Sequence, residues 1–287
     1  MKRIWYNIVK IYIRTGLFLF HKKIIVNGLN NIPGKGAVLF VSNHKNALID
    51  PLLIATTATR TIHFLTRASA FKIKFVKWLL STVNMLPIYR MRDGKETLIK
   101  NEEIFNKCYE ILNKKKTLLI FPEGTHDVKR WVRPLSKGFT RIAFGTLEQN
   151  PDLELQIVPI GLNYTEATLF GESVSIYYGK PILVNPFFNM KDINASTIEL
   201  KKVIHDKMKE VTTHIDIENY EETIEKLGDV NYLNPEKVKD LLQKLPYEKP
   251  STLGQYKPSF LWKALKFIVS VNSFIPLIIY KSIEPNI

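Results

Sequence analysis

Short apolar runs alternate with longer amphipathic stretches over most of this chain, and that alternation restricts the fold more than any other feature. The run from Ala37 to Val41 is wholly apolar and predicts a core strand, whereas residues 23–27 predict an edge strand. Further strands are predicted at residues 61–66, 117–121, 156–162 and 173–178, and helices at 51–59, 71–80, 93–112 and 137–148. Strands separated by helices indicate an α/β chain with a three-layer αβα domain.

A polar segment follows the predicted core strand directly, and it contains His44 and Asp50. Loops at the carboxyl ends of strands are where α/β folds place their chemistry. An imidazole is suited to moving a proton near neutral pH, and a nearby carboxylate can fix its tautomer and stabilise the imidazolium. Positions six apart face different ways on one helix, so the two side chains meet only if the segment between them is a turn.

An alternative interpretation of this segment needs no chemistry. Asp50 followed by Pro51 and an apolar run is a good helix start, with Asp50 as the N-cap and Pro51 at the first helical position. In that case His44 would be an ordinary surface residue. A second polar turn, Phe121-Pro122-Glu123-Gly124-Thr125, ends the predicted strand 117–121 and favours the chemical interpretation.

Four ordered blocks give the chain a family resemblance. The segments Asn43-His44…Asp50-Pro51 and Phe121-Pro122-Glu123-Gly124-Thr125 resemble the glycerolphosphate and lysophosphatidate acyltransferase family. Two more family blocks lie in the expected order, Leu86-Pro87-Ile88-Tyr89-Arg90 and Ile157-Val158-Pro159-Ile160-Gly161. The resemblance covers residues 43–161 and not the two ends of the chain.

Three positions depart from the family pattern. Five residues separate His44 from Asp50 where four are commonest, which is similar to a branch that includes glycerolphosphate acyltransferases. The second block usually opens with Gly, and Asn84 stands there; Asn tolerates positive φ, so the turn is expected to persist. His126 follows the Phe-Pro-Glu-Gly-Thr turn where the family commonly has Arg, and we keep it as a candidate substrate-binding residue.

The resemblance implies an O-acyltransferase of phospholipid biosynthesis. Its substrates would be a fatty acyl thioester, on CoA or an acyl carrier protein, and a glycerol phosphate with a free hydroxyl. His44 would take the hydroxyl proton while Asp50 orients the ring, and Asn43 would shape the turn beside the substrate. No metal and no further cofactor are expected. We favour 1-acylglycerol 3-phosphate as acceptor, giving phosphatidic acid; glycerol 3-phosphate and a catalytically inactive peripheral membrane-binding protein are the alternatives.

The acceptor phosphate needs cationic and neutral donors, and the resemblance supplies candidates for both. Arg90 offers a planar fork that binds two oxygens and keeps its charge. Arg92 is either a helper or an ordinary surface arginine. Gly124 and Thr125 would offer backbone and hydroxyl donors. Glu123 would repel phosphate, so it is expected to position Arg90 or a backbone amide.

The formal net charge of +14 predicts an anionic partner, either nucleic acid or a membrane surface. No zinc-finger spacing or RNP-like strand occurs, and the basic residues often accompany aromatic and aliphatic ones. A membrane lipid surface is therefore favoured, and nucleic acid is not expected. Cys108 is the only cysteine, which excludes an intramolecular disulfide, and its neighbours predict a buried helical position.

Residues 1–25 predict a membrane-interface helix. Their uncharged run is too short to span a bilayer, and Trp5, Tyr6 and Tyr12 would lie near the headgroups. The alternative is a helix packed on the domain's own core. The helix at residues 71–80 is basic and amphipathic, so it either touches lipid or faces the core with a solvated lysine edge.

The remaining chain divides into three parts. Residues 26–215 form the predicted catalytic domain, residues 216–255 a charged helical extension, and residues 256–287 an apolar membrane-associated segment. These features predict an enzyme on a membrane, facing the cytoplasm, at the inner membrane if the source is bacterial. The sequence indicates no oligomeric state.

Overall fold

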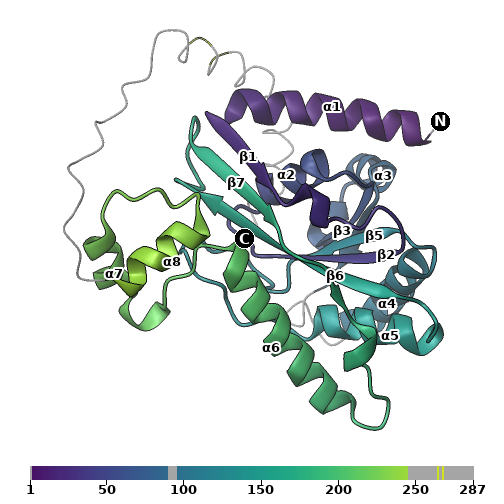
Figure 1. Cartoon of the computed structure of the whole chain (residues 1–287). Coiled ribbons are helices and arrows are strands. Elements are labelled where there is room, and N and C mark those ends of the chain that lie inside the picture. Colours follow the sequence, from purple (N-terminus) through teal and green to yellow (C-terminus); the bar gives the residue numbers. More distant parts are fainter. Residues whose placement is uncertain (1, 90–95, 245–263, 265–266, 268–287) are drawn as a thin grey trace.

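The computed structural model describes residues 2–89, 96–244, 264 and 267 (Figure 1). Its strands are β1 (Lys23–Asn27), β2 (Ala37–Ser42), β3 (Ile62–Arg67), β4 (Met85–Ile88), β5 (Thr117–Ile120), β6 (Leu155–Tyr164), β7 (Ser173–Tyr178) and β8 (Ile182–Leu183). Its α-helices are α1 (Lys2–Phe20), α2 (Ile49–Thr57), α3 (Lys74–Thr82), α4 (Glu96–Asn113), α5 (Gly138–Gln149), α6 (Ile193–Val211), α7 (Tyr220–Leu227) and α8 (Pro235–Gln243). The chain is thus mixed α/β, as predicted.

One mixed sheet, mostly parallel, organises the molecule, with the strand order β1-β7-β6-β2-β5-β3-β4 and β8 beside β6. The central strand β2 pairs in parallel with β5 on one side and β6 on the other. In this register Val41 lies opposite Ile120, and Ser42 lies opposite Ile160. The carboxyl ends of β2 and β5 therefore meet at one edge, which places the segments after Val41 and Ile120 side by side.

Helices cover both faces of the sheet, because successive side chains of a strand point to opposite faces. Leu39 of β2 belongs to an apolar cluster that includes residues of α4, α5 and α6. Phe40, the next residue, belongs to a second cluster with residues of α1 and α2. Both faces of β2 are fully buried, which explains the apolar run from Ala37 to Val41. The three predicted layers are present in the described part of the chain.

Most boundaries agree with the prediction to within three residues, and two strands, β4 and β8, were not predicted. Strand β4 was not predicted, because Pro87 lies within it; proline is tolerated there because β4 forms the edge of the sheet. Asn84, directly before β4, has φ 64°, so the positive-φ turn expected at this position is confirmed. Cys108 is fully buried in α4, also as predicted.

Helix α1 packs on the domain along one side only. Leu17 is buried in the cluster with α2, whereas Ile4, Ile8 and Ile11 are exposed. The prediction that Tyr6 lies at the headgroups is wrong, because its ring is buried and its hydroxyl accepts a hydrogen bond from Ile62 N at 3.4 Å. Within the described ranges, no helix has the length and apolar character needed to cross a bilayer.

Residues beyond α6 form a small helical unit. Helices α7 and α8 enclose their own apolar cluster, which includes Ile215, Tyr232 and Val238. Helices α7 and α8 lie within the residues for which a helical extension was predicted, 216–255. The apolar segment predicted at residues 256–287 lies outside the described residues, apart from two positions in a helix.

Candidate active site

Asn43 determines where the chain leaves the sheet after β2. Its side chain is fully buried, and its amide donates to Leu162 O at 2.9 Å and accepts from Leu162 N at 2.8 Å. The side chain thereby continues the β2–β6 pairing by one step beyond the last backbone pair. Both polar groups of Asn43 are committed to β6, so this geometry fits the expected turn-shaping role and not substrate contact.

The segment after Asn43 is a turn that closes on Asp50, as the pairing with His44 required. Asp50 Oδ2 accepts hydrogen bonds from His44 Nδ1 at 2.8 Å, Lys45 N at 2.6 Å and Asn46 N at 2.8 Å. Its other oxygen, Oδ1, accepts from the Tyr164 hydroxyl at 2.5 Å. Four donors therefore hold this buried carboxylate, which is the arrangement that keeps a buried charge stable.

Asp50 does not cap α2, so the alternative interpretation of this residue is wrong. The helix begins at Ile49, and Asp50 lies in its first turn. The amides of Leu48 and Ile49 are satisfied instead by Asn46 Oδ1, at 3.1 and 3.0 Å. Because Asn46 accepts these two hydrogen bonds at the start of α2, the Asp50 carboxylate is available to His44.

The His44 ring is fixed on three sides and open on the fourth. It stacks on Phe121 with ring centroids 4.1 Å apart, and His126 meets it edge-on at 5.9 Å. With Nδ1 donating to the Asp50 carboxylate, the neutral form of the ring presents the lone pair of Nε2. No described residue bonds to Nε2, and 15% of the side chain is exposed. The ring is therefore oriented to accept a proton from a molecule outside the fold.

Glu123 joins the second polar turn to the first. Its carboxylate accepts from His44 N at 3.3 Å and from Arg133 N at 3.2 Å. The expectation that Glu123 positions a backbone amide fits this contact. Burial raises the pKa of Glu123, while the Lys45 ammonium and the two backbone amides oppose that rise. Asp127 N donates to His44 O at 3.0 Å. The same loop therefore holds both the backbone nitrogen and the carbonyl oxygen of His44.

Lys45 is a member of the site that sequence reasoning missed. It is buried, and Nζ donates to the carbonyl oxygens of Lys129 and Trp131. Burial lowers the pKa of Lys45, and the nearby carboxylates of Glu123, Asp127 and Asp50 oppose that shift. The side chain thus ties the loop after β5 to the His44 turn.

Tyr164 was missed for a different reason, because it lies 114 residues from Asp50. It ends β6, and its hydroxyl is directed at Asp50 Oδ1 in the buried layer. Burial raises the pKa of Tyr164 well above its usual value, and the Asp50 charge raises it further. The hydroxyl therefore remains a donor. A tyrosine in a strand is an ordinary β-former, so the sequence carried no signal for this contact.

The other predicted site residues lie on the turn after β5 or outside the described ranges. Gly124 has φ 76°, the left-handed conformation that favours glycine. Thr125 accepts from Arg133 Nη1 through its carbonyl oxygen at 3.0 Å and its hydroxyl at 2.5 Å. Arg90 and Arg92 lie outside the described residues. Elsewhere in the described chain, no group of three or more His, Cys, Asp or Glu residues is placed to hold a metal ion.

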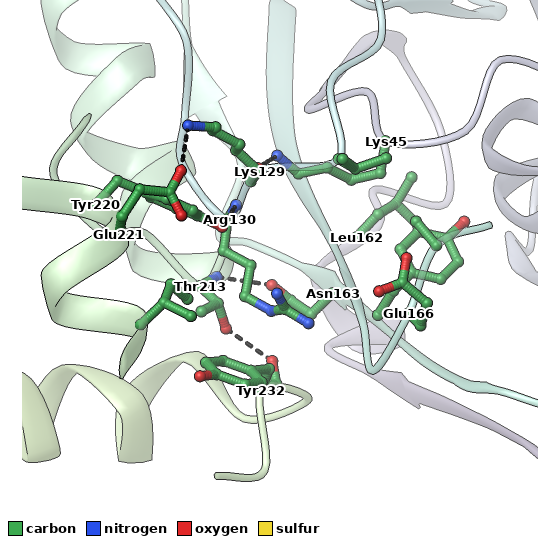
Figure 2. Close-up of a pocket in the computed structure, with 14 residues that line it drawn as sticks. Lys45, Lys129, Arg130, Leu162, Asn163, Glu166, Thr213, Tyr220, Glu221 and Tyr232 are labelled. Carbon is green, nitrogen blue, oxygen red and sulfur yellow. Dashed lines mark hydrogen bonds and ion pairs between the residues drawn. The ribbon is translucent and has the colours of Figure 1, made fainter. Parts of the chain in front are cut away.

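A cavity of about 280 Å³ lies beside the His44 turn, lined by the end of β6, by residues 128–130 of the loop after β5 and by α7 (Figure 2). Lys45 and Tyr164 line it, but His44 does not. The Arg130 guanidinium lies over the Tyr232 ring at 4.0 Å and donates to Thr165 O at 2.6 Å. These contacts connect the helical unit to the sheet, so we assign no substrate to this cavity.

Comparison with known proteins places these features in a family context. Residues 23–163 match the family model described as Acyltransferase. The chain is 25% identical over 180 residues to 1-acyl-sn-glycerol-3-phosphate acyltransferase LPAT1 of Arabidopsis thaliana, covering 61% of this chain and 48% of that protein. It is 26% identical over 214 residues to the 1-acyl-sn-glycerol-3-phosphate acyltransferase of Borreliella burgdorferi, covering 72% and 78%. The chain spans about half the length of the plant relatives that it matches.

A shorter match and a solved structure complete the comparison. Glycerol-3-phosphate O-acyltransferase 2 of Saccharomyces cerevisiae is 30% identical over 109 residues, which is 37% of this chain and 15% of that protein. The crystal structure of the 1-acyl-sn-glycerophosphate acyltransferase PlsC from Thermotoga maritima superposes with a TM-score of 0.51 at 20% identity. The superposition covers 71% of this chain and 80% of the PlsC chain, which shows a common fold.

Proposed function

Residues 23–163 belong to the Acyltransferase family, as the four sequence blocks predicted, and from that premise we propose that the chain transfers a fatty acyl group from a thioester to 1-acylglycerol 3-phosphate. The product would be phosphatidic acid. The observation that carries this proposal is the His44 ring, with Nδ1 on the buried Asp50 and Nε2 open. A base in this state is suited to activating a hydroxyl group.

The proposed reaction is a direct transfer. The acceptor hydroxyl oxygen attacks the thioester carbonyl carbon, a C–O bond forms and the C–S bond breaks. His44 Nε2 takes the hydroxyl proton and then gives it to the departing thiolate. Asp50 stabilises the imidazolium between these two events. A well-placed base contributes roughly 10²- to 10⁴-fold, and alignment of the two substrates contributes further.

No covalent acyl-enzyme is needed, because a thioester is already an activated donor. Two side chains that could act as nucleophiles elsewhere, Ser42 and Cys108, are also poorly suited. Ser42 is buried, and its hydroxyl donates to Asn43 O at 3.0 Å. Cys108 is buried in α4, and burial raises the pKa of its thiol to about 12. His44 is therefore assigned as a base and not as an activator of a side-chain nucleophile.

Two arginines are proposed to hold the acceptor phosphate. Arg90 is proposed from the family resemblance, and Asn101 of α4 holds the adjacent Tyr89 backbone through two hydrogen bonds of 2.8 and 3.0 Å. Arg133 is proposed from the structure, because its guanidinium is anchored on Thr125 in the turn that contacts His44. Arg133 would thus supply charge near the position where the family commonly has arginine and this chain has His126.

Replacing Arg90 or Arg133 by lysine is expected to raise the acceptor KM while leaving the donor KM unchanged. Lysine keeps the charge but loses the two-pronged geometry, and a charge-assisted contact contributes about 1.5–3 kcal/mol, or roughly 10- to 150-fold. Arg60→Lys is the control, because Arg60 binds the carbonyl oxygens of Pro33 and Gly36 at 2.7 Å. Equal losses for donor and acceptor would contradict the phosphate assignment.

Tyr164 is proposed to position Asp50, so Tyr164→Phe should lower kcat about tenfold with little change in either KM. The variant keeps the ring but leaves Asp50 Oδ1 without its donor, so the carboxylate holds His44 less firmly. Tyr178→Phe is the matched control, since that buried hydroxyl pairs with Thr57 at 2.8 Å. A similar fall in kcat for both variants would point to general loss of packing.

The acceptor is the part of the proposal that most needs a direct test. Yeast relatives carry the name glycerol-3-phosphate O-acyltransferase, so glycerol 3-phosphate is the second candidate. Purified full-length chain would be assayed with both acceptors and with acyl-CoA and acyl carrier protein donors. We expect faster transfer to 1-acylglycerol 3-phosphate. Faster transfer to glycerol 3-phosphate would establish the second candidate, and no transfer by a folded, membrane-bound protein would favour an inactive binding protein.

The proposed reaction would take place at a membrane, because the acceptor and the product are lipids. We place the enzyme on the cytoplasmic side, where acyl thioesters are available. Helix α1 would lie in the interface, with its exposed residues toward lipid and Leu17 against the domain. Removal of residues 1–20 should then weaken binding to vesicles.

A further inference from the structure

Helix α3 exposes an apolar surface that the domain does not use. Phe75 and Trp78 are 63% and 58% exposed, and Ile73, just before the helix, is 46% exposed. The rings of Phe75 and Trp78 lie 6.0 Å apart, so they form a continuous patch. Val76, on the opposite side, is buried and holds the helix to the domain. Exposed aromatic clusters of this kind mark interaction sites.

Helix α1 presents a second apolar stripe close to α3. The stripe follows a helical period and consists of Ile4, Ile8, Ile11 and Phe18. Trp5 Nε1 donates to Thr82 Oγ1 at 3.0 Å, which ties the beginning of α1 to the end of α3. Figure 1 shows α3 beside the amino-terminal part of α1. The two apolar surfaces therefore belong to one region of the molecule.

The charge of the chain is concentrated in this same region. Residues 1–92 contain 15 Lys and Arg and one acidic residue, Asp50, which is buried. The other 195 residues contain 26 basic and 26 acidic residues. The whole net charge of +14 thus lies in the first third of the chain. Around α3, Lys72, Lys74 and Lys77 are all exposed beside the aromatic patch.

We propose that α1 and α3 together form one docking face for an anionic bilayer, with Phe75 and Trp78 inserted among the acyl chains. Lys72, just before α3, and Lys74 and Lys77 of α3 would contact anionic headgroups. Apolar side chains flanked by lysine, with no acidic residue on either helix, match that surface. This docking face would set the orientation of the enzyme on the membrane. Its use in catalysis rests on the proposed function, whereas the binding itself does not.

Docking through both helices would turn the active-site edge of the sheet toward the lipid. Helix α1 ends at Phe20, and the ring of the next residue, His21, lies 6.2 Å from the ring of Tyr164. Helix α3 follows the carboxyl end of β3, which runs parallel to β5. Both helices therefore reach the edge that carries His44. A single contact through α1 would leave the domain free to rotate about it, whereas two contacts fix its orientation.

The test is co-sedimentation of the full-length chain with vesicles of phosphatidylcholine, alone or mixed with phosphatidylglycerol. The double variant F75S/W78S should lose about tenfold or more in affinity for both vesicles. Replacing Lys72, Lys74 and Lys77 by glutamine should lose at least about tenfold on the anionic vesicles and little on the neutral ones. The matched control is M190S/I198S, which alters two similarly exposed apolar residues at α6.

Unchanged binding of F75S/W78S, or equal losses in the M190S/I198S control, would overturn the proposal. Tighter vesicle binding by a chain that ends at residue 244 would also overturn it, because the carboxyl-terminal segment would then occupy the face. A dimer that F75S/W78S dissociates would assign the face to a second copy. Each readout is binding without substrate, so a failure here is separate from a failure of the proposed reaction. With a short-chain, water-soluble acceptor, F75S/W78S should turn over as the wild type does.

Discussion

Replacement of His44 by alanine should lower the rate of acyl transfer by roughly 10²- to 10⁴-fold, the usual contribution of a general base. The backbone contacts of this residue, His44 N to Glu123 and His44 O from Asp127 N, do not involve the ring. The turn should therefore keep its shape, and the thermal unfolding temperature should change little. The measurement is kcat for phosphatidic acid formation, together with circular dichroism of the variant.

His63 provides the matched control for this substitution. It is a partly buried histidine of β3, and its Nδ1 contacts Thr117 O at 3.1 Å at the opposite end of the sheet. His63→Ala should retain transfer within a few-fold of the wild type. If folded His44→Ala protein turned over at a near-normal rate, His44 would not be the base.

Asp50→Asn is expected to produce the second large loss, again roughly 10²- to 10⁴-fold in kcat. The substitution removes the charge that stabilises the imidazolium. It also places an NH₂ group where the carboxylate now accepts from His44, Lys45, Asn46 and Tyr164. At least one of these buried donors would lose its acceptor, at a cost of about 1–3 kcal/mol in the free energy of unfolding.

Asp192→Asn is the control for the same change of residue away from the site. Asp192 accepts a hydrogen bond from Ala195 N at 2.9 Å at the start of α6, so its replacement should affect the helix end alone. We expect wild-type kcat for that variant. Recovery of activity in Asp50→Asn protein at low temperature, where folding is restored, would contradict a catalytic role for the charge.

Much of the site could be predicted because it depends on the register of two buried strands. The apolar runs before His44 and Glu123 identify β2 and β5, which pair in parallel with Val41 opposite Ile120. His44 and Glu123 each follow three residues later, so they meet at one edge. The turn at Asn84 could be predicted for a local reason, since asparagine adopts positive φ more readily than most residues.

The missed contacts depend on distant packing, for which a single sequence carries little signal. Lysine is rarely buried, so the sequence did not indicate that the Lys45 ammonium binds two carbonyl oxygens, from residues 129 and 131. Tyr164 reaches Asp50 only because β6 lies next to β2. The burial of Tyr6 depends on which face of α1 packs on the domain. Tyrosine is suited both to a core and to a membrane interface, so the amphipathic pattern did not show which of the two Tyr6 occupies.

In the proposed mechanism the acyl group passes directly from the thioester to the acceptor hydroxyl, with His44 taking the proton. A single-turnover rapid-quench experiment tests it, using labelled acyl thioester and the full-length chain on anionic vesicles. We predict that label leaves the thioester only after 1-acylglycerol 3-phosphate is added, and that it appears in phosphatidic acid with none bound to protein. Label that binds the protein covalently without acceptor, and then moves to the acceptor when it is added, would contradict this mechanism.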